Sequence, residues 1–256
     1  MKVGDKMFVQ ELATLIKNSK NTIFFGGAGV STESGIPDFR SETGLYSAKQ
    51  NYGYSPEELI SHTFFNRNAE LFFKYYKENL IAADAKPNPA HYAFAELEER
   101  GLLRAVITQN IDGLHSTAGS KNVFELHGSN FRQYCKNCGE KYTLDYIFVP
   151  QNCDGNIPKC EKCGGVVRPD VVLYEEQLDD VVLRNAVKCI SEAELMIVGG
   201  TSLAVYPAAG LLSYFGGKNL VIINKSKTPS DKRAQLIIHD AIGTVMHDVM
   251  RIINVL

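Results

Sequence analysis

The sequence has no excess of positive charge and no long run of apolar residues. Lys and Arg number 27 against 29 Asp and Glu, so the composition gives no general attraction to nucleic acid or to an acidic membrane surface. No segment approaches the length of a transmembrane helix, and residues 1–20 contain no apolar run of signal-peptide length. We therefore predict a cytoplasmic protein with no nucleic-acid and no membrane partner.

Internal repeats, low-complexity segments and a G-x-S-x-G motif are also missing from the 256 residues. Their absence argues against a repeat protein, a disordered chain and a serine hydrolase. Hydrophobic residues make up 45% of the chain and charged residues 22%, which are values typical of globular proteins. The length suits one large α/β domain with an inserted smaller module.

Five of the six cysteines lie in one short stretch, which indicates a metal site in a reducing compartment more than a disulfide framework. Two Cys-x-x-Cys pairs, Cys135 with Cys138 and Cys160 with Cys163, are separated by 21 residues. Four thiolates at this spacing predict a closed, tetrahedral structural zinc site. A redox dithiol is the alternative, and it is disfavoured because there are two pairs and neither opens a βαβ helix.

The stretch from Thr22 to Arg40 has the pattern of a nucleotide-binding loop. An apolar run, residues 22–25, predicts a buried strand. Glycines at 26, 27 and 29 then allow a sharp turn, and residues 30–34 are expected to form the first turn of a helix. A glycine-rich turn between strand and helix is where α/β proteins hold a pyrophosphate. Residues 35–40, with a proline, a carboxylate, an aromatic ring and a guanidinium, suit closure over a ribose and base.

Polar side chains follow two further predicted strands. The strand at 104–108 is followed by Gln109, Asn110 and Asp112, and the strand at 123–126 by His127. Open α/β sheets bind their ligands at the carboxyl ends of their strands. From the residues alone, helix capping by Asn110 or Asp112 and a structural role for His127 remain open.

Strands predicted at 195–198, 220–223 and 235–238 end in the same way, in turns that carry hydrogen-bonding groups. Strands that alternate with helices, and that carry their polar groups at their ends, predict a Rossmann-like parallel sheet with helices on both faces. An amphipathic helix is expected near residues 8–16. The aromatic residues between Phe64 and Tyr76 are expected to form a small helical module packed on the main sheet; the alternative is the wall of an apolar substrate channel.

The run GAGVSTESGIPDFR, the Gln109–Asp112 cluster, His127-Gly128, the two Cys-x-x-Cys pairs and Gly200-Thr201-Ser202 together resemble the sirtuin family, and the resemblance covers nearly the whole chain. It implies a bacterial-type NAD-dependent protein-lysine deacetylase. In that reaction the acetyl oxygen attacks the ribose carbon that releases nicotinamide, a histidine acts as general base on a ribose hydroxyl, and the acetyl group ends on ADP-ribose. Histidine suits this role because its unperturbed pKa lies near working pH.

The resemblance also implies roles for individual residues. His127 and Asn110 would be catalytic, and acetylated lysine-containing proteins would lie along Val171, Val172, Leu173 and Tyr174. Zinc would be structural, held by Cys135, Cys138, Cys160 and Cys163. NAD would be bound by Ala28, Gly29, Ser31, Thr32, Asp38, Phe39, Arg40, Gln109, Asn110, Ile111, Asp112, His127, Gly200, Thr201, Ser202, Asn224, Lys225, Ala241 and Ile242.

The expected organisation is a Rossmann-like domain at 1–41, 88–131 and 168–256, with a helical insertion that carries the cofactor loop at 42–87 and a zinc module at 132–167. The chain departs from the family pattern in two places. Gly26 replaces a threonine, and Tyr174-Glu175-Glu176 replaces Phe-Gly-Glu, the extra carboxylate being expected to be solvated. Residues 74–77 lack the Tyr-x-x-Arg pair of relatives that prefer succinyl groups, which favours deacetylation.

Three other functions share some of these features. A dehydrogenase would leave the zinc module and the Gln109–Asp112 cluster unexplained. Mono-ADP-ribosyl transfer uses the same cleavage of NAD and stays open. A non-catalytic NAD sensor is disfavoured because Asn110, Asp112 and His127 are all present.

Overall fold

A computed structural model of the chain describes residues 3–37 and 48–255. Its centre is a six-stranded sheet in the order β11-β10-β9-β1-β2-β3, and every pairing in it is parallel. The strands are β1 (Thr22–Gly26), β2 (Ala105–Thr108), β3 (Val123–Glu125), β9 (Leu195–Gly199), β10 (Asn219–Ile223) and β11 (Leu236–Ile238). The Rossmann-like sheet predicted from the sequence is confirmed.

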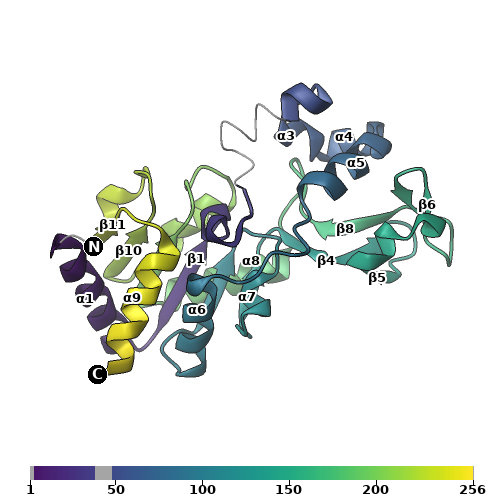
Figure 1. Cartoon of the computed structure of the whole chain (residues 1–256). Helices are drawn as coiled ribbons and strands as arrows, with labels where there is room; N and C mark the ends of the chain where they lie inside the picture. The colour runs from purple at the N-terminus through teal and green to yellow at the C-terminus, as the bar shows by residue number, and fades with distance from the viewer. Residues whose placement is uncertain (1–2, 38–47, 256) are drawn as a thin grey trace.

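Helices cover both faces of this sheet (Figure 1). On one face lie α1 (Val3–Asn18), α6 (Pro89–Glu99) and α9 (Ile242–Val255), and on the other α8 (Asp180–Glu192) and the 3₁₀ segment η5 (Ala208–Tyr214). Strand β1 is buried along its whole length, as a central parallel strand should be. Its side chains alternate between the faces, so Phe24 stacks on Phe94 of α6 at 3.8 Å while Phe25 packs in the opposite cluster.

Chain order fixes where the sheet binds ligands. From β1 the chain builds outward through β2 and β3, then returns to β9 on the other side of β1 and continues to β10 and β11. This reversal next to β1 is the kind of switch point at which open α/β sheets bind ligands, outside the carboxyl ends of the strands.

A smaller lobe projects from that edge (Figure 1). It contains an antiparallel sheet β5-β4-β8, the hairpin β6-β7 and, among other described segments, the helices α3 to α5. The elements are α3 (Pro56–Leu59), α4 (His62–Arg67), α5 (Ala69–Asn79), β4 (Gly128–Cys135), β5 (Lys141–Thr143), β6 (Cys153–Asp154), β7 (Ile157–Pro158) and β8 (Val167–Val171). A short helix, α7 (Leu114–Thr117), follows β2.

The aromatic residues of α4 and α5 do not pack on the main sheet as expected from the sequence. Phe65, Phe72, Phe73 and Tyr76 form one cluster of buried residues with side chains of the β4–β8 region, including Cys135. The three phenylalanine rings meet edge to face, as between Phe72 and Phe73 at 5.3 Å, while Phe72 and Tyr76 stack with their ring centroids 6.0 Å apart. The helical and cysteine-bearing segments therefore share one core, because each offers an apolar face that neither buries alone.

The expected helical turn after the glycine-rich loop is a second difference. The chain forms two short 3₁₀ segments, η1 (Ala28–Val30) and η2 (Thr32–Ser34). Gly35 then takes a left-handed conformation with φ of 82°, which ends a helix. Pro37 has no N–H to donate, so an α-helix cannot continue through it.

No helix within the described ranges combines the length and apolar character needed to cross a membrane. Two helices begin with side-chain caps. Ser55 forms a capping box at α3, and the Asn88 side chain caps α6.

Candidate active site

A cleft with a volume of about 530 Å³ lies at the carboxyl edge of the parallel sheet, and both lobes contribute to its walls. It brings together most residues that the sequence singled out. The predicted residues in its lining are Ala28, Gly29, Ser31, Gln109, Asn110, Ile111, Asp112, His127, Val171, Val172, Leu173, Tyr174, Gly200, Thr201 and Ser202.

Two glycine turns cross at the floor of the cleft. The N–H of Gly29 donates to the carbonyl of Gly200 at 2.8 Å. A Cβ on Gly29 would lie 2.8 Å from the Gly200 backbone, and one on Gly200 would lie 2.3 Å from the backbone N of Val30. Both positions therefore require glycine, and backbone lines this part of the cleft, as binding of a pyrophosphate requires.

A chain of three polar side chains joins the first two strand ends. The Asn110 side-chain amide donates to Ser31 Oγ at 3.0 Å, and the Ser31 hydroxyl donates to Asp112 Oδ2 at 2.6 Å. Asp112 Oδ1 accepts the N–H of Leu114 at 2.9 Å. Asp112 thus bonds the first residue of α7, but the N-cap position of that helix is Gly113 and no side chain caps it there. The second oxygen of Asp112 bonds Ser31 instead.

Hydrogen bonding fixes the tautomer of His127. Its Nδ1 lies 2.8 Å from the carbonyl oxygen of Gln109. Because a carbonyl only accepts, Nδ1 carries the proton in the neutral ring, and Nε2 is left as the nitrogen able to take up a proton. The Gln109 side chain donates to Thr201 Oγ1 at 3.2 Å, which connects the end of β2 to the turn after β9.

Residues 171–176, the rim segment, form one edge of the cleft. The N–H of Val172 donates to the carbonyl of His127 at 2.9 Å, and that of Leu173 to Glu176 Oε2 at 2.9 Å. The N–H of Tyr174 donates to the carbonyl of Ile60 at 3.1 Å. The carbonyls of Val171, Leu173 and Tyr174 also accept hydrogen bonds from within the chain, whereas no described group donates to that of Val172.

An ion pair joins Glu176, the last residue of the rim segment, to Arg168, with N···O distances of 2.6 and 3.0 Å. The Arg168 side chain is only 6% exposed. Burial alone would raise the pKa of Glu176, but hydrogen bonds from Arg168, His62 and the N–H of Leu173 outweigh it and lower the pKa to about 2.

Glu176→Gln should lower the free energy of unfolding at pH 7 by about 2 to 3 kcal/mol, because it leaves the buried Arg168 guanidinium without its counter-charge. The depressed pKa stabilises the fold above the ordinary value of 4.5, and this contribution is lost as pH falls toward 2. Urea unfolding of both proteins between pH 2 and 7 should therefore show a difference that shrinks below about pH 4.5.

Glu192→Gln is the matched control for this prediction. It breaks the Arg104–Glu192 pair, whose N···O distance is 2.7 Å but whose side chains are 40% and 42% exposed, so it should cost less than about 1 kcal/mol. Equal costs for the two variants would show that burial of Arg168 does not matter.

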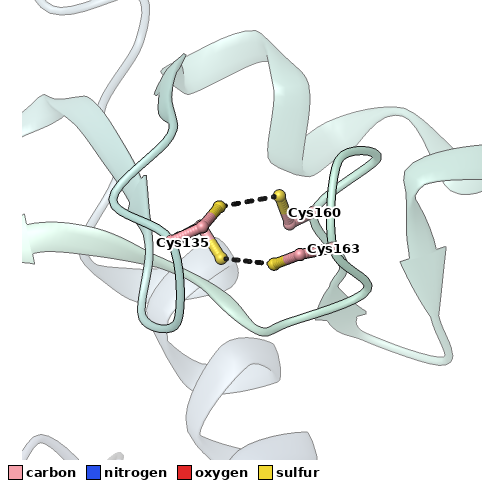
Figure 2. A group of neighbouring side chains, drawn as sticks. Cys135, Cys160 and Cys163 are labelled. Carbon is pink, nitrogen blue, oxygen red and sulfur yellow. Dashed lines mark hydrogen bonds between the residues drawn. The ribbon is translucent and has the colours of Figure 1, made fainter.

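The four predicted zinc ligands converge in the small lobe. The sulfurs of Cys135, Cys138, Cys160 and Cys163 all lie within 4.8 Å of one another, and Figure 2 shows the labelled three pointing into one space. Burial opposes ionisation of Cys160, but hydrogen bonds from the Tyr142 hydroxyl and from backbone amides lower its pKa to about 6. Four converging sulfurs fit a tetrahedral zinc ion that would have no open position.

Other predicted residues stand outside the lining of the cleft. Thr32, Asn224, Lys225, Ala241 and Ile242 do not line it. The Asn224 side-chain amide donates to the carbonyl of Ser226, within its own loop. Asp38, Phe39 and Arg40 lie outside the described residues, as do residues 42–47 at the start of the insertion predicted to carry the cofactor loop.

The extra carboxylate of the rim segment is exposed, but it is not simply solvated as the sequence suggested. Glu175 Oε2 accepts hydrogen bonds from the backbone N–H and the hydroxyl of Thr63, at 2.9 and 2.6 Å. The sequence also missed several apolar residues of the lining, among them Ile81, Phe131, Leu144, Val205 and Tyr206. For Tyr206 a signal existed, since it closely follows the hydroxyl-bearing turn at 201–202.

Comparisons with known proteins agree with this geometry. A model of the Sir2 family matches residues 27–207. An NAD-dependent protein deacetylase of Clostridium acetobutylicum is 57% identical over 94% of this chain and 98% of its own length, and one of Clostridium perfringens is 58% identical over the same shares. A solved structure of Sir2 with a p53 peptide and NAD+ superposes with a TM-score of 0.86 at 40% identity, over 97% of this chain and 99% of its own.

Another, of Sir2 bound to an acetylated peptide, has a TM-score of 0.85 at 38% identity, over 97% of this chain and 99% of its own. The family model spans more than half of the chain, and these relatives are matched over almost their whole length. The chain therefore belongs to the Sir2 family.

Proposed function

We propose that this chain is an NAD-dependent protein-lysine deacetylase, which cleaves NAD, transfers the acetyl group to ADP-ribose and releases nicotinamide and the deacetylated lysine. One observation carries the assignment. A single cleft holds the Asn110–Ser31–Asp112 chain of side chains next to His127, whose acceptor nitrogen is set by the Gln109 carbonyl. A dehydrogenase would need neither feature, and a silent sensor would have no use for a histidine prepared in this way.

Each part of the cleft would have its own role in the reaction. The crossing glycine turns at Gly29 and Gly200 would hold the phosphates. Asn110 would order the ribose from which nicotinamide departs, and Asp112 would hold the carboxamide. His127 Nε2 would accept the proton of a ribose hydroxyl, the base role for which a neutral imidazole is suited.

The rim segment would bind the acetylated peptide by strand addition, which recognises backbone more than side chains. No described group donates to the carbonyl of Val172, and we assign it as an acceptor for an N–H of the substrate. An apolar wall that includes Phe131 and Leu144 would favour a neutral acyl-lysine over a charged lysine, since burying an unpaired ammonium is unfavourable.

We infer further that the four cysteines hold a structural zinc ion. We also infer that the zinc module spans residues 132–167 and that the helical insertion spans residues 42–87. The shared aromatic core supports placing both in one lobe. Thiolates that must stay reduced to hold the metal also suit a cytoplasmic location.

Mass spectrometry of the purified protein with an acetyl-lysine peptide, with and without NAD, tests the assignment. Loss of the acetyl group only with NAD, together with O-acetyl-ADP-ribose and nicotinamide, would establish the deacetylase. A peptide that gains ADP-ribose would move the assignment to mono-ADP-ribosyl transfer. NAD binding without turnover would favour the sensor.

The structure also bears on the choice of acyl group. No lysine or arginine occurs among the described residues that line the cleft. Lys77, which aligns with the arginine of succinyl-preferring relatives, donates to the carbonyl of Asn156 at 3.1 Å in the β6–β7 turn.

We therefore expect kcat/KM for a succinyl-lysine peptide to be roughly 100-fold or more below that for the acetyl peptide, because the second carboxylate would be buried without a partner. Steady-state rates on the two peptides of identical sequence decide this, and a propionyl peptide is the neutral control of greater length. Comparable rates for acetyl and succinyl groups would contradict the prediction.

A further inference from the structure

Glu175 has an unusual backbone for its residue type. Its φ is 75°, and among the described residues only Leu203 is another non-glycine with positive φ. This left-handed conformation is unfavourable for a side chain with a Cβ and is ordinarily occupied by glycine. The rim segment lines the cleft, and strained residues that persist beside a binding site often serve it.

The carboxylate of Glu175 reaches across to the helical segment. It accepts both the backbone N–H of Thr63, at 2.9 Å, and the Thr63 hydroxyl, at 2.6 Å. Thr63 lies in the first turn of α4, just after the N-cap Ser61. A negative charge is favourable there because the first N–H groups of a helix have no partner within it. These hydrogen bonds also hold the pKa of Glu175 below its usual value, so the group is ionised at neutral pH.

The two neighbours of Glu175 make contacts of the same kind. The carbonyl of Tyr174 accepts a hydrogen bond from the N–H of His62 at 3.0 Å, and the N–H of Tyr174 donates to the carbonyl of Ile60. Glu176 contacts His62 Nδ1 at 2.8 Å. Three successive residues of the rim segment are thus bonded to residues 60–63. The bond from Glu175 depends on its side chain, although the left-handed backbone at this position would suit a glycine, which has none.

We propose that Glu175 is a positioning residue for the peptide substrate, which fixes the rim segment against the first turn of α4 before the peptide binds. The inference rests on the proposed function, because it takes the rim segment to be the strand that receives the peptide. A segment already held in its binding conformation loses less conformational freedom on binding, which raises affinity without any new contact to the ligand.

Three variants distinguish positioning of the rim segment by Glu175 from a direct effect of the Glu175 charge on substrate binding. Glu175→Gly removes the carboxylate and relieves the backbone, so it should fold. Glu175→Gln keeps an oxygen that accepts from Thr63 but removes the charge. Thr63→Val removes the hydroxyl donor from the other side and leaves the backbone N–H in place.

Steady-state deacetylation should give a split between the two substrates. Glu175→Gly should raise the KM for an acetyl-lysine peptide by about three- to tenfold, which corresponds to about 0.7 to 1.4 kcal/mol, with the KM for NAD and kcat within about twofold of the parent protein. Glu175→Gln should keep the peptide KM close to that of the parent, and Thr63→Val should lie between the parent and the glycine variant. A change in Glu175→Gln as large as in Glu175→Gly would assign the effect to charge and overturn the proposal.

Hydrogen–deuterium exchange provides a second test of the proposal that does not depend on catalysis. The amides of residues 172–174 and of Thr63 should exchange faster in Glu175→Gly than in the parent, while amides of β1 and β9 should not change. Unchanged exchange, or faster exchange with an unchanged peptide KM, would each overturn the proposal. If the parent protein deacetylates nothing, the proposed function fails, and the affinity of the acetyl-lysine peptide for each variant, measured by calorimetry, decides the role of Glu175 in place of KM.

Discussion

His127→Ala is expected to lower kcat for deacetylation by about 10²- to 10⁴-fold, the contribution typical of a positioned general base. The Gln109 carbonyl holds the proton on Nδ1, so that only Nε2 of the neutral ring is able to accept one. Alanine leaves no group at that place to take the ribose proton. The fold should persist, because the imidazole is only partly buried and is not a member of any of the buried apolar clusters.

The measurements are kcat with saturating NAD and peptide, and the affinity for NAD by calorimetry. NAD binding should stay within a few-fold of the parent value, because the phosphates and the carboxamide are assigned to other residues. His247→Ala, at an exposed position on α9, is the control and should keep parental rates. Full activity in His127→Ala would refute the assigned mechanism.

Cys160→Ser is expected to remove most of the bound zinc and to lower the free energy of unfolding by roughly 3 kcal/mol or more. Two of the four cysteines, Cys135 and Cys160, belong to the same buried cluster as Phe72 and Tyr76. Loss of the metal should therefore loosen α5 as well as the sheet β5-β4-β8, and the Tyr76 hydroxyl that donates to Asn130 Oδ1 at 2.9 Å lies at the junction.

Zinc content by elemental analysis and unfolding by heat should change together. Cys153→Ser is the matched control, because Cys153 lies between the two pairs in sequence, does not belong to the four-sulfur cluster and is only partly buried. It should leave zinc content at one ion per chain. Parental zinc content in Cys160→Ser would show that the ligand set is wrong, and zinc loss without loss of stability would show that the metal does not support the lobe.

Short-range physics accounts for what the sequence determined by itself. A fully buried parallel strand needs apolar residues on both faces, so β1 and β9 are legible as continuous apolar runs. Ser55 and Asn88 cap helices through groups within three residues of themselves. Cysteine spacing reveals a metal site because two knuckles need only be close in space for four thiolates to meet. Polar residues just after strands are candidates for ligand binding in any parallel sheet.

Contacts between distant residues could be decided only by the tertiary structure. Ser31 and Asp112 are 81 positions apart and Glu175 and Thr63 are 112 apart, and nothing local in either segment encodes its partner. The same holds for the aromatic residues of α5, whose apolar pattern calls for burial but not against a particular surface. They pack on the cysteine-bearing sheet because that sheet also has an apolar face to cover. The sequence pattern indicates which residues must be buried or hydrogen-bonded, but which residues they contact depends on how the chain folds in space.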